Sequence, residues 1–263
     1  IIGACGDKEK YTVASGITPS GVVHIGNFRE VITVEFVAQA LRARGKEVRF
    51  IYSWDDFDTF RKVPVNLPNQ EMLKKHLREP ISRVPDPFGK AESYAAHNIQ
   101  YFESQIEKVG IAPEFLYQSK RYGAGMYAQG MRTALENKDT LKKILDEHRS
   151  TPLADDWLPT TIYCEKCNRD EMEYQSYKGE WDYAYKCSSC SHEAVTDIRE
   201  TSNLKLNWRT DWPMRWAFEK VDFEPGGKDH SSEGGSFDTG KRIVKQIWDM
   251  KAPQYLQYDF VMI

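Results

Sequence analysis

The sequence predicts an α/β fold, in which a doubly wound parallel sheet is interrupted by a small β-rich insertion. A β-prone run at residues 11–15 is broken by a glycine-rich turn at 16–21, and apolar residues then recur at helical spacing as far as Leu41. A second apolar run follows at residues 48–52. Strand, turn, helix and strand in this order form one parallel βαβ unit.

The rest of the chain continues the alternation of helices and strands. After a proline-rich surface stretch at 63–90, we expect a helix at 92–109, a strand at 115–118, helical residues at 123–148 in two segments, a helix that starts at Asp211-Trp212-Pro213, a strand at 221–224, a glycine-rich turn at 226–230, a helix at 237–248 and a last strand at 255–263. These elements divide the chain into three parts. Residues 10–158 form the first half of the α/β domain, 159–198 the β-rich insertion and 199–263 the second half.

Composition and charge exclude several classes of protein. The 263 residues include 36 Lys and Arg against 39 Asp and Glu, a net charge of −3, which excludes an overall basic coat for nucleic acid but not a local basic face. No apolar run reaches the ~18 residues of a membrane span, and residues 1–10 lack the pattern of a signal peptide. We therefore expect a cytoplasmic globular enzyme with no membrane partner.

Two cysteine pairs predict a metal site. Cys164 and Cys167 are separated by two residues, as are Cys187 and Cys190, and this double spacing is typical of a four-cysteine zinc ribbon. Four thiolates fill the tetrahedral shell that zinc prefers, so the Zn²⁺ would be structural and not catalytic. Two disulfides, four free thiols, or His192 in place of one cysteine are the alternatives.

A histidine and an asparagine open the first long helix. His24-Ile25-Gly26-Asn27 follows the first glycine-rich turn, and a helix N-terminus offers unpaired N–H groups and a positive dipole end that suit a phosphate. Gly26 lets a nucleotide approach the backbone closely. A lone histidine at this place can also be a simple cap or a surface residue.

Several longer strings, in the same order, resemble one enzyme family. Together with the Gly-x-Asp-His element at Gly227, Asp229 and His230, the first motif resembles the HIGH signature of the class I aminoacyl-tRNA synthetases, with Asn27 in the last position. The sequence is most similar to the class I lysyl-tRNA synthetases, through residues 15–21 (SGITPSG), 24–30 (HIGNFRE), 54–58 (WDDFD), 61–64 (RKVP), 84–87 (VPDP), 211–216 (DWPMRW) and 227–230 (GKDH). The resemblance runs from about residue 10 to the end.

This resemblance implies a Rossmann-like nucleotide-binding sheet and a two-step reaction. ATP, with Mg²⁺, would activate L-lysine to lysyl-adenylate, and the lysyl group would pass to tRNA(Lys). It implies ATP contacts by Gly16, His24, Gly26, Asn27, Gly227 and Asp229, of which His24 and Asn27 would be catalytic, and lysine contacts by Gly16, Thr18, Trp208, His230 and Tyr258.

A lysine pocket needs an apolar wall for the stem and an anion for the ammonium. The tryptophans at 208, 212 and 216 can supply the wall, and Asp55, Asp56 and Asp58 follow the second strand, where parallel sheets bind ligands. We name Asp56 as the lysine contact, while the sequence leaves open which of the three carboxylates meets the ammonium, and a solvated acidic loop is the alternative.

The sequence also departs from the family pattern. The KMSKS signature and the helical anticodon-binding region are absent, and the sequence stops at Ile263 where that loop would begin, so we expect a piece of a longer protein. Some relatives hold another zinc near the VPDP string. Here Asp86 and His97 are present but Lys90 and Ala91 replace the other two ligands, so we expect one metal.

Two other functions compete with this hypothesis. A tRNA-independent adenylate-forming amino-acid ligase would use the same histidine turn, and pyrophosphate exchange with and without tRNA separates the two. A nucleic-acid-binding ribbon on an α/β scaffold is the second alternative, but residues 160–198 mix both charge signs where such a ribbon should be basic and aromatic.

Overall fold

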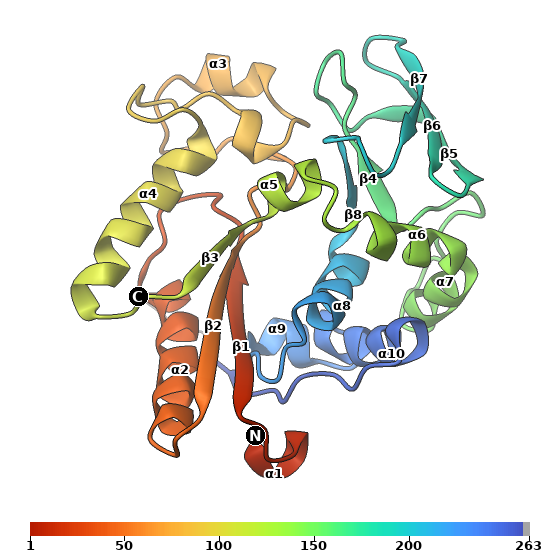
Figure 1. The fold of residues 1–263 in the computed structure, drawn as a ribbon. Helices are drawn as coiled ribbons and strands as arrows, with labels where there is room; N and C mark the ends of the chain where they lie inside the picture. The colour runs from red at the N-terminus through yellow and green to blue at the C-terminus, as the bar shows by residue number, and fades with distance from the viewer. Residues whose placement is uncertain (260–263) are drawn as a thin grey trace.

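A parallel β-sheet forms the centre of the molecule. The computed structural model describes residues 1–259. Strands β1 (Lys10–Ile17), β2 (Glu47–Trp54) and β3 (Glu114–Tyr117) lie side by side in the order β1-β2-β3, and both pairs are parallel (Figure 1). This arrangement confirms the βαβ unit predicted from the sequence.

The sheet continues on the other side of β1 through shorter pairings. Val13 bridges to Phe223 and Phe223 to Gln254, both in parallel, and β9 (Gly226–Gly227) pairs with β10 (Gln257–Tyr258). Parallel pairings therefore lie on both sides of β1, as a Rossmann-like fold requires. The predicted α/β fold is confirmed. The predicted strand at 221–224 makes only the Phe223 bridges, and residues 260–263 of the predicted last strand lie outside the described residues.

Helices cover the two faces of the sheet. Because neighbouring residues of a strand point to opposite faces, Val13 packs into the core beneath α2 (Ile25–Arg42) and α4 (Tyr94–Ile106), while Ala14 packs against α8 (Trp208–Glu219) and α10 (Ser236–Trp248). Figure 1 shows the same three layers.

Shorter elements complete the α/β part. They are α1 (Ile2–Cys5), α3 (Gln70–Lys75), α5 (Gln118–Gly123), α6 (Ala128–Glu136), α7 (Lys138–Asp146), α9 (Lys228–Ser231) and two 3₁₀ turns (Ile81–Arg83 and Glu107–Val109). The helical stretch predicted at 123–148 is thus α6 and α7. The proline-rich stretch is not wholly irregular, because it contains α3 and one 3₁₀ turn.

The β-rich insertion consists of antiparallel strands. Strands β5 (Met172–Gly179), β6 (Asp182–Cys187) and β7 (Glu193–Asp197) form a three-stranded sheet, and β4 (Thr160–Ile162) pairs with β8 (Leu204–Leu206). The β4–β8 pairing carries the antiparallel part past residue 198. Figure 1 shows this unit and the segment around α3 together at the end of the molecule to which the parallel strands point.

The start of α8 differs from the sequence expectation. The helix begins at Trp208 and not at Asp211, so Pro213 lies inside it and leaves the carbonyl of Arg209 without the usual helical donor. Beginning one turn earlier allows Trp208 to stack on Trp212, with ring centroids 5.0 Å apart. Aromatic packing therefore outweighs the local preference of proline for the first turn.

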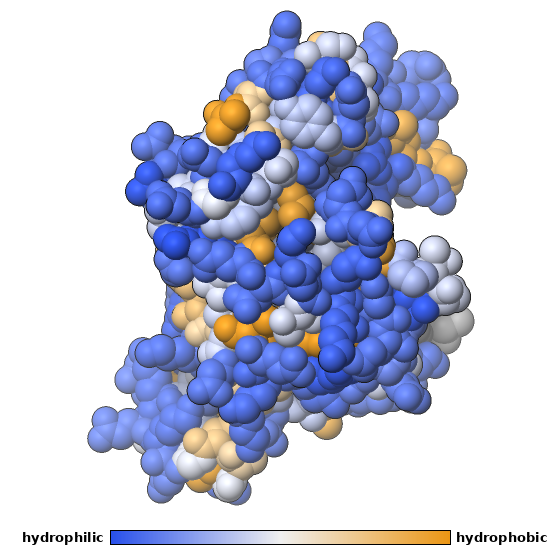
Figure 2. Space-filling view, turned by 90° about the vertical axis from the view of Figure 1, so that its right-hand side faces the viewer, coloured by the Kyte–Doolittle hydropathy of each residue, from blue (hydrophilic) through white to orange (hydrophobic). Residues whose placement is uncertain are grey.

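The surface is mainly hydrophilic. Figure 2 shows a face on which apolar residues form small, separate groups. Among the helices within residues 1–259, none combines the length and the apolar character needed to cross a bilayer.

We predict that Trp216→Ala destabilises the fold strongly. Trp216 is 1% exposed and fills the space between the sheet and α10, where its ring closely approaches Gly240. Loss of the ring should lower the free energy of unfolding by about 3–5 kcal/mol. Phe36→Ala, at a side chain that is 63% exposed on α2, is the control. Denaturant unfolding of both variants tests this, and equal effects would contradict the packing described.

Candidate active site

A cavity of about 830 Å³ lies at the carboxyl ends of the parallel strands. Its wall combines the turn after β1, the start of α2, the loop after β2, the β8–α8 junction and the β9–α9 turn. The predicted site residues that line it are Gly16, Thr18, His24, Gly26, Asn27, Trp208, Gly227, Asp229, His230 and Tyr258. The structure thus brings together all of the predicted ATP and lysine contacts except Asp56.

His24 caps helix α2 and still faces the cavity. Its Nδ1 accepts a hydrogen bond from the Gly26 N–H at 3.0 Å, and Asn27 Oδ1 accepts one from the His24 N–H at 3.4 Å. A ring nitrogen that accepts a hydrogen bond carries no proton, so the proton of a neutral His24 is on Nε2. The cap therefore presents an Nε2–H donor, and the Asn27 amide offers N–H donors at the same helix start.

A half-buried glutamate lies between two predicted lysine contacts. Glu30 lines the cavity, accepts a hydrogen bond from the Gly16 N–H at 3.2 Å and accepts another from the Tyr258 hydroxyl. Burial raises the pKa of Glu30 to about 7, although both hydrogen bonds act against the shift. Gly16 is required here because a Cβ would lie 2.7 Å from the Ser53 carbonyl oxygen.

The structure does not bring Asp56 to the cavity. The Asp56 carboxylate accepts from the Ser119 N–H at 2.8 Å and from the Ser119 hydroxyl, so it anchors the start of α5. Asp55 and Asp58, from the same acidic run, line the cavity instead. Three aspartates within four residues cannot all point the same way, and the sequence alone does not show which one turns inward.

Asp58 forms a polar chain across the cavity wall. Its carboxylate accepts from Thr18 Oγ1 at 2.8 Å and pairs with Lys205 Nζ at 2.5 Å. Burial alone would lower the pKa of Lys205, but Asp58 and Asp211 hold it above its ordinary value, so this lysine stays charged. These polar contacts join the turn after β1 to strand β8, which pairs with β4 of the insertion.

A second buried cation lies beneath the cavity. Arg215 Nη1 is 2.7 Å from Asp55 Oδ1 and donates to Ser53 Oγ at 2.6 Å, while its Nε lies 3.3 Å from Asp211. Burial raises the pKa of Asp55 and Arg215 opposes this. The pair occupies the floor beneath Glu30, in a small side cavity that both residues line.

Aromatic rings form one wall. Trp208 stacks on Trp212, and His230 lies 6.1 Å and 5.6 Å from their ring centroids. His230 Nδ1 is held at 2.7 Å from Ser236 Oγ. Beside it, Gly227 precedes α9, and the half-exposed Asp229 opens to the cavity.

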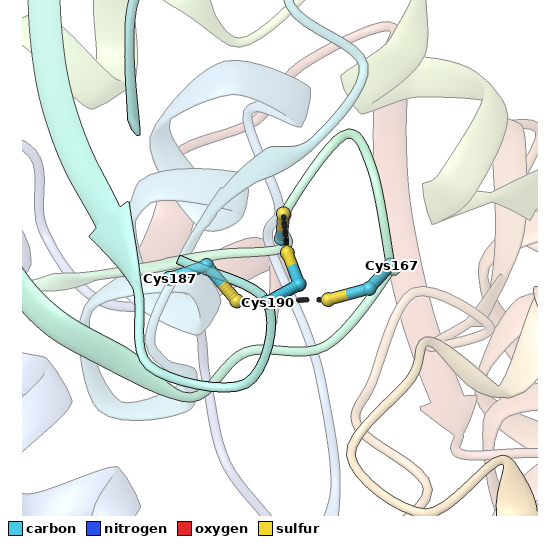
Figure 3. A group of neighbouring side chains, drawn as sticks. Cys167, Cys187 and Cys190 are labelled. Carbon is cyan, nitrogen blue, oxygen red and sulfur yellow. Dashed lines mark hydrogen bonds between the residues drawn. The ribbon is translucent and has the colours of Figure 1, made fainter. Parts of the chain in front are cut away.

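The four paired cysteines meet in the insertion. Their sulfur atoms all lie within 4.8 Å of one another, and the Cys164–Cys190 and Cys167–Cys187 distances are 3.6 Å each. Figure 3 shows Cys167, Cys187 and Cys190 converging from two loops. Sulfur atoms ~2.3 Å from one tetrahedral zinc would be about 3.8 Å apart, so the thiols fit this metal and are too far apart to be disulfides.

The other candidate ligands have different partners. His192 Nε2 lies 2.7 Å from Glu165, away from the four-sulfur group. Asp86 accepts from the backbone N–H groups of Phe88, Lys90 and Ala91 and lies 3.2 Å from His97 Nδ1. The residues near the VPDP string are thus joined to one another by hydrogen bonds.

Comparison with known proteins decides the family. The family described as tRNA synthetases class I (K) matches residues 2–263. The chain belongs to this family. It is 53% identical over 258 residues to a "Lysine--tRNA ligase" of Borreliella burgdorferi, covering 98% of this chain and 49% of that protein.

Other relatives of this class I (K) synthetase chain carry the same name. One from Thermococcus kodakarensis is 55% identical over 267 residues, covering 100% of this chain and 50% of the relative. One from Treponema pallidum is 48% identical over 257 residues, covering 97% and 48%. The chain thus spans about half the length of the curated relatives that it matches.

Three charged residues of the cavity were given no role in the sequence analysis. Glu30, Lys205 and Arg61 line it, yet none was assigned a role. Glu30 follows Asn27 by three residues on the same helix, so helical spacing could have placed it on the cavity side. No local pattern marks Lys205, which reaches the cavity only because β8 pairs with β4.

We predict that Arg215→Ala destabilises the chain by about 3–5 kcal/mol, because it leaves Asp55 and Asp211 buried without their cation. Lys245→Ala removes an exposed pair with Asp249 and should change the unfolding free energy by less than about 1 kcal/mol. Urea unfolding at neutral pH measures both. If Arg215→Ala lowers the unfolding free energy no more than Lys245→Ala does, the buried ion pairs of Arg215 do not stabilise the residues beneath the cavity.

Proposed function

We propose that this chain is the catalytic part of a lysine–tRNA ligase, which activates L-lysine with ATP and transfers it to tRNA(Lys). One observation supports the proposal: the hydrogen-bond donors at the start of α2 and the half-buried Glu30 carboxylate line the same cavity. The names of the relatives support the choice of amino acid.

The nucleotide occupies the side formed by α2 and the β9–α9 turn. His24 Nε2–H and the Asn27 amide donate to the α-phosphate, where negative charge develops during adenylyl transfer. Gly16 and Gly26 allow the nucleotide to approach the backbone, and Gly227 and Asp229 bind the adenosine, with Asp229 accepting from a ribose hydroxyl.

The lysine occupies the side formed by Glu30, Trp208 and Tyr258. Trp208 and His230 cover the four-carbon stem, and Gly16 and Thr18 face the backbone of the amino acid. Among the described residues, Glu30 accepts hydrogen bonds from Tyr258 and Gly16 and makes no ion pair, so its charge is available to the substrate ammonium. Glu30 therefore takes the role that we assigned to Asp56 from the sequence.

The first step is an in-line displacement. An oxygen of the lysine carboxylate attacks the α-phosphorus of ATP, and pyrophosphate leaves as the lysyl-adenylate forms. Positioning and electrostatic stabilisation account for the rate, as in other phosphoryl transfers, and Mg²⁺ accompanies the ATP. A ribose hydroxyl of the tRNA end then attacks the activated carbonyl, and AMP leaves.

A structural Zn²⁺ completes the insertion. Cys164, Cys167, Cys187 and Cys190 would hold it and leave no position for a water, so its role is to fix the loops that carry these residues. Free thiols in pairs suit a reducing compartment, and we place the protein in the cytoplasm.

A chimaera tests the activity. This chain replaces the matched half of the Borreliella burgdorferi relative, and ATP–pyrophosphate exchange is measured with each amino acid. We expect exchange with lysine and charging of tRNA(Lys). Exchange with lysine but no charging would favour a tRNA-independent ligase, and exchange with a different amino acid would contradict the proposal.

Glu30→Gln should weaken lysine binding to this chain by about 10- to 100-fold, because a charged hydrogen bond is replaced by a neutral one. Isothermal titration should show little change for ATP. Asp56→Asn, a buried carboxylate outside the cavity, is the matched control and should bind lysine normally. Loss of lysine affinity in Asp56→Asn alone would contradict the role of Glu30 and favour Asp56 as the lysine contact.

The protonation of Glu30 predicts that lysine binding depends on pH. A proton on Glu30 must leave before the carboxylate can bind an ammonium, and its pKa is about 7 in the free chain. Lysine affinity should therefore rise from about pH 6 to 8 and then level off. Glu30→Gln should remove most of this rise, and an unchanged pH profile in the variant would assign the titration to another group.

One zinc per chain is expected from metal analysis of the purified protein. Cys187→Ser should lose most of the metal because it removes one of four ligands. Cys5→Ser changes the remaining cysteine and should keep it. Purified wild-type protein without zinc, or full zinc in Cys187→Ser, would contradict the assignment.

A further inference from the structure

The loop after β2 forms part of the cavity wall, and hydrogen bonds from two other segments of the chain hold it in place. Asp58, Thr59 and Arg61 of this loop line the cavity. The Phe60 N–H donates to the Glu79 carbonyl at 2.7 Å, and the Arg78 N–H donates to the Phe60 carbonyl at 2.9 Å, so the segment before the VPDP string supports the loop on one side.

The insertion supports the loop on the other side. Thr59 Oγ1 donates to Asp170 Oδ2 at 2.8 Å and lies 2.9 Å from the Tyr163 hydroxyl. The Tyr163 hydroxyl is also 3.0 Å from the Phe57 carbonyl oxygen. Tyr163 is fully buried and the Asp170 side chain is 7% exposed, so water cannot easily replace these contacts.

Both anchors flank the first cysteine pair. Tyr163 directly precedes Cys164, and Asp170 follows Cys167 by three residues. Within this knuckle (residues 164–170), the Cys164 N–H donates to the Arg169 carbonyl at 2.9 Å and the Asn168 N–H to the Cys164 carbonyl at 2.8 Å. The knuckle therefore sets the distance between the two groups that hold Thr59.

The knuckle is itself clamped to the loop's other support. Arg78 Nε lies 2.8 Å from Asp170 Oδ1, and the Asp170 N–H donates to the Arg78 carbonyl at 3.0 Å. Arg83 donates to Asn168 Oδ1 at 2.8 Å and to the Ser202 carbonyl at 2.9 Å. Asp170 thus joins the knuckle, the Arg78 segment and the cavity loop.

We propose that the first cysteine knuckle positions the cavity loop for lysine binding, and that Asp170 is the positioning residue that transmits this. Asp58 lies between Phe57 and Thr59 in this loop. Its carboxylate accepts a hydrogen bond from Thr18 and pairs with Lys205. Release of Thr59 therefore loosens the Asp58–Thr18 contact on the lysine side. Within residues 1–259, no hydrogen bond or ion pair joins the residues proposed to bind the nucleotide on α2 and α9 to Thr59, Tyr163 or Asp170. The inference rests on the proposed lysine site.

The test compares Asp170→Ala, Asp170→Asn and Glu173→Ala in this chain with its metal bound. Glu173 is exposed, pairs with Lys186 and lies on the same insertion, so its loss is the control. We expect Asp170→Ala to weaken lysine binding about tenfold and ATP binding less than twofold. Asp170→Asn keeps an oxygen for the Thr59 hydroxyl and should recover part of the affinity.

Two further readouts separate positioning from a general loss of structure. Hydrogen exchange should become faster in residues 57–61 of Asp170→Ala, with the zinc content unchanged. If that variant does not fold, Thr59→Val removes the same hydrogen bond without a change of shape. Equal loss of lysine and ATP affinity, or unchanged lysine affinity, would overturn the inference. Wild-type protein that binds no lysine would instead refute the proposed function. Faster hydrogen exchange of residues 57–61 in Asp170→Ala would still show that Asp170 holds the loop.

Discussion

Three carboxylates around the cavity at the carboxyl ends of the parallel strands are the constraint on which the site depends. Glu30, Asp55 and Asp58 lie around one cavity, where desolvation of their charges costs free energy. Arg215 neutralises Asp55 and Lys205 neutralises Asp58, which leaves Glu30 with neutral donors among the described contacts. Glu30 is thus the carboxylate of this group that lacks a cationic partner among the described residues, which is why we propose it as the acceptor of a substrate ammonium.

The same constraint ties the distant parts of the chain together. Lys205 belongs to the β4–β8 pair of the insertion, and Arg215 belongs to α8 of the second half of the α/β domain. Neither residue lies near Asp55 or Asp58 in the sequence, yet each forms an ion pair with a carboxylate of the first half. The insertion is thus part of the cavity wall and not an independent attachment.

Local patterns predicted the α/β fold, and the resemblance to a family predicted many of the residues that line the cavity. The βαβ unit follows from short-range periodicity and the cysteine cluster from fixed spacing, so both are visible in the sequence. The choice between Asp55, Asp56 and Asp58 was not, because it depends on Ser119 of α5, which captures the Asp56 carboxylate. The start of α8 was also misplaced, since stacking of Trp208 on Trp212 is a tertiary preference that overrides the proline signal.

A crystal structure of this chain with a non-hydrolysable sulfamoyl analogue of lysyl-adenylate tests the central claim most directly. The account predicts the lysine ammonium between Glu30 and the Tyr258 hydroxyl, and the sulfamoyl group within hydrogen-bond distance of His24 Nε2 and Asn27. An ammonium bound elsewhere in the cavity, or a sulfamoyl group away from the start of α2, would contradict it.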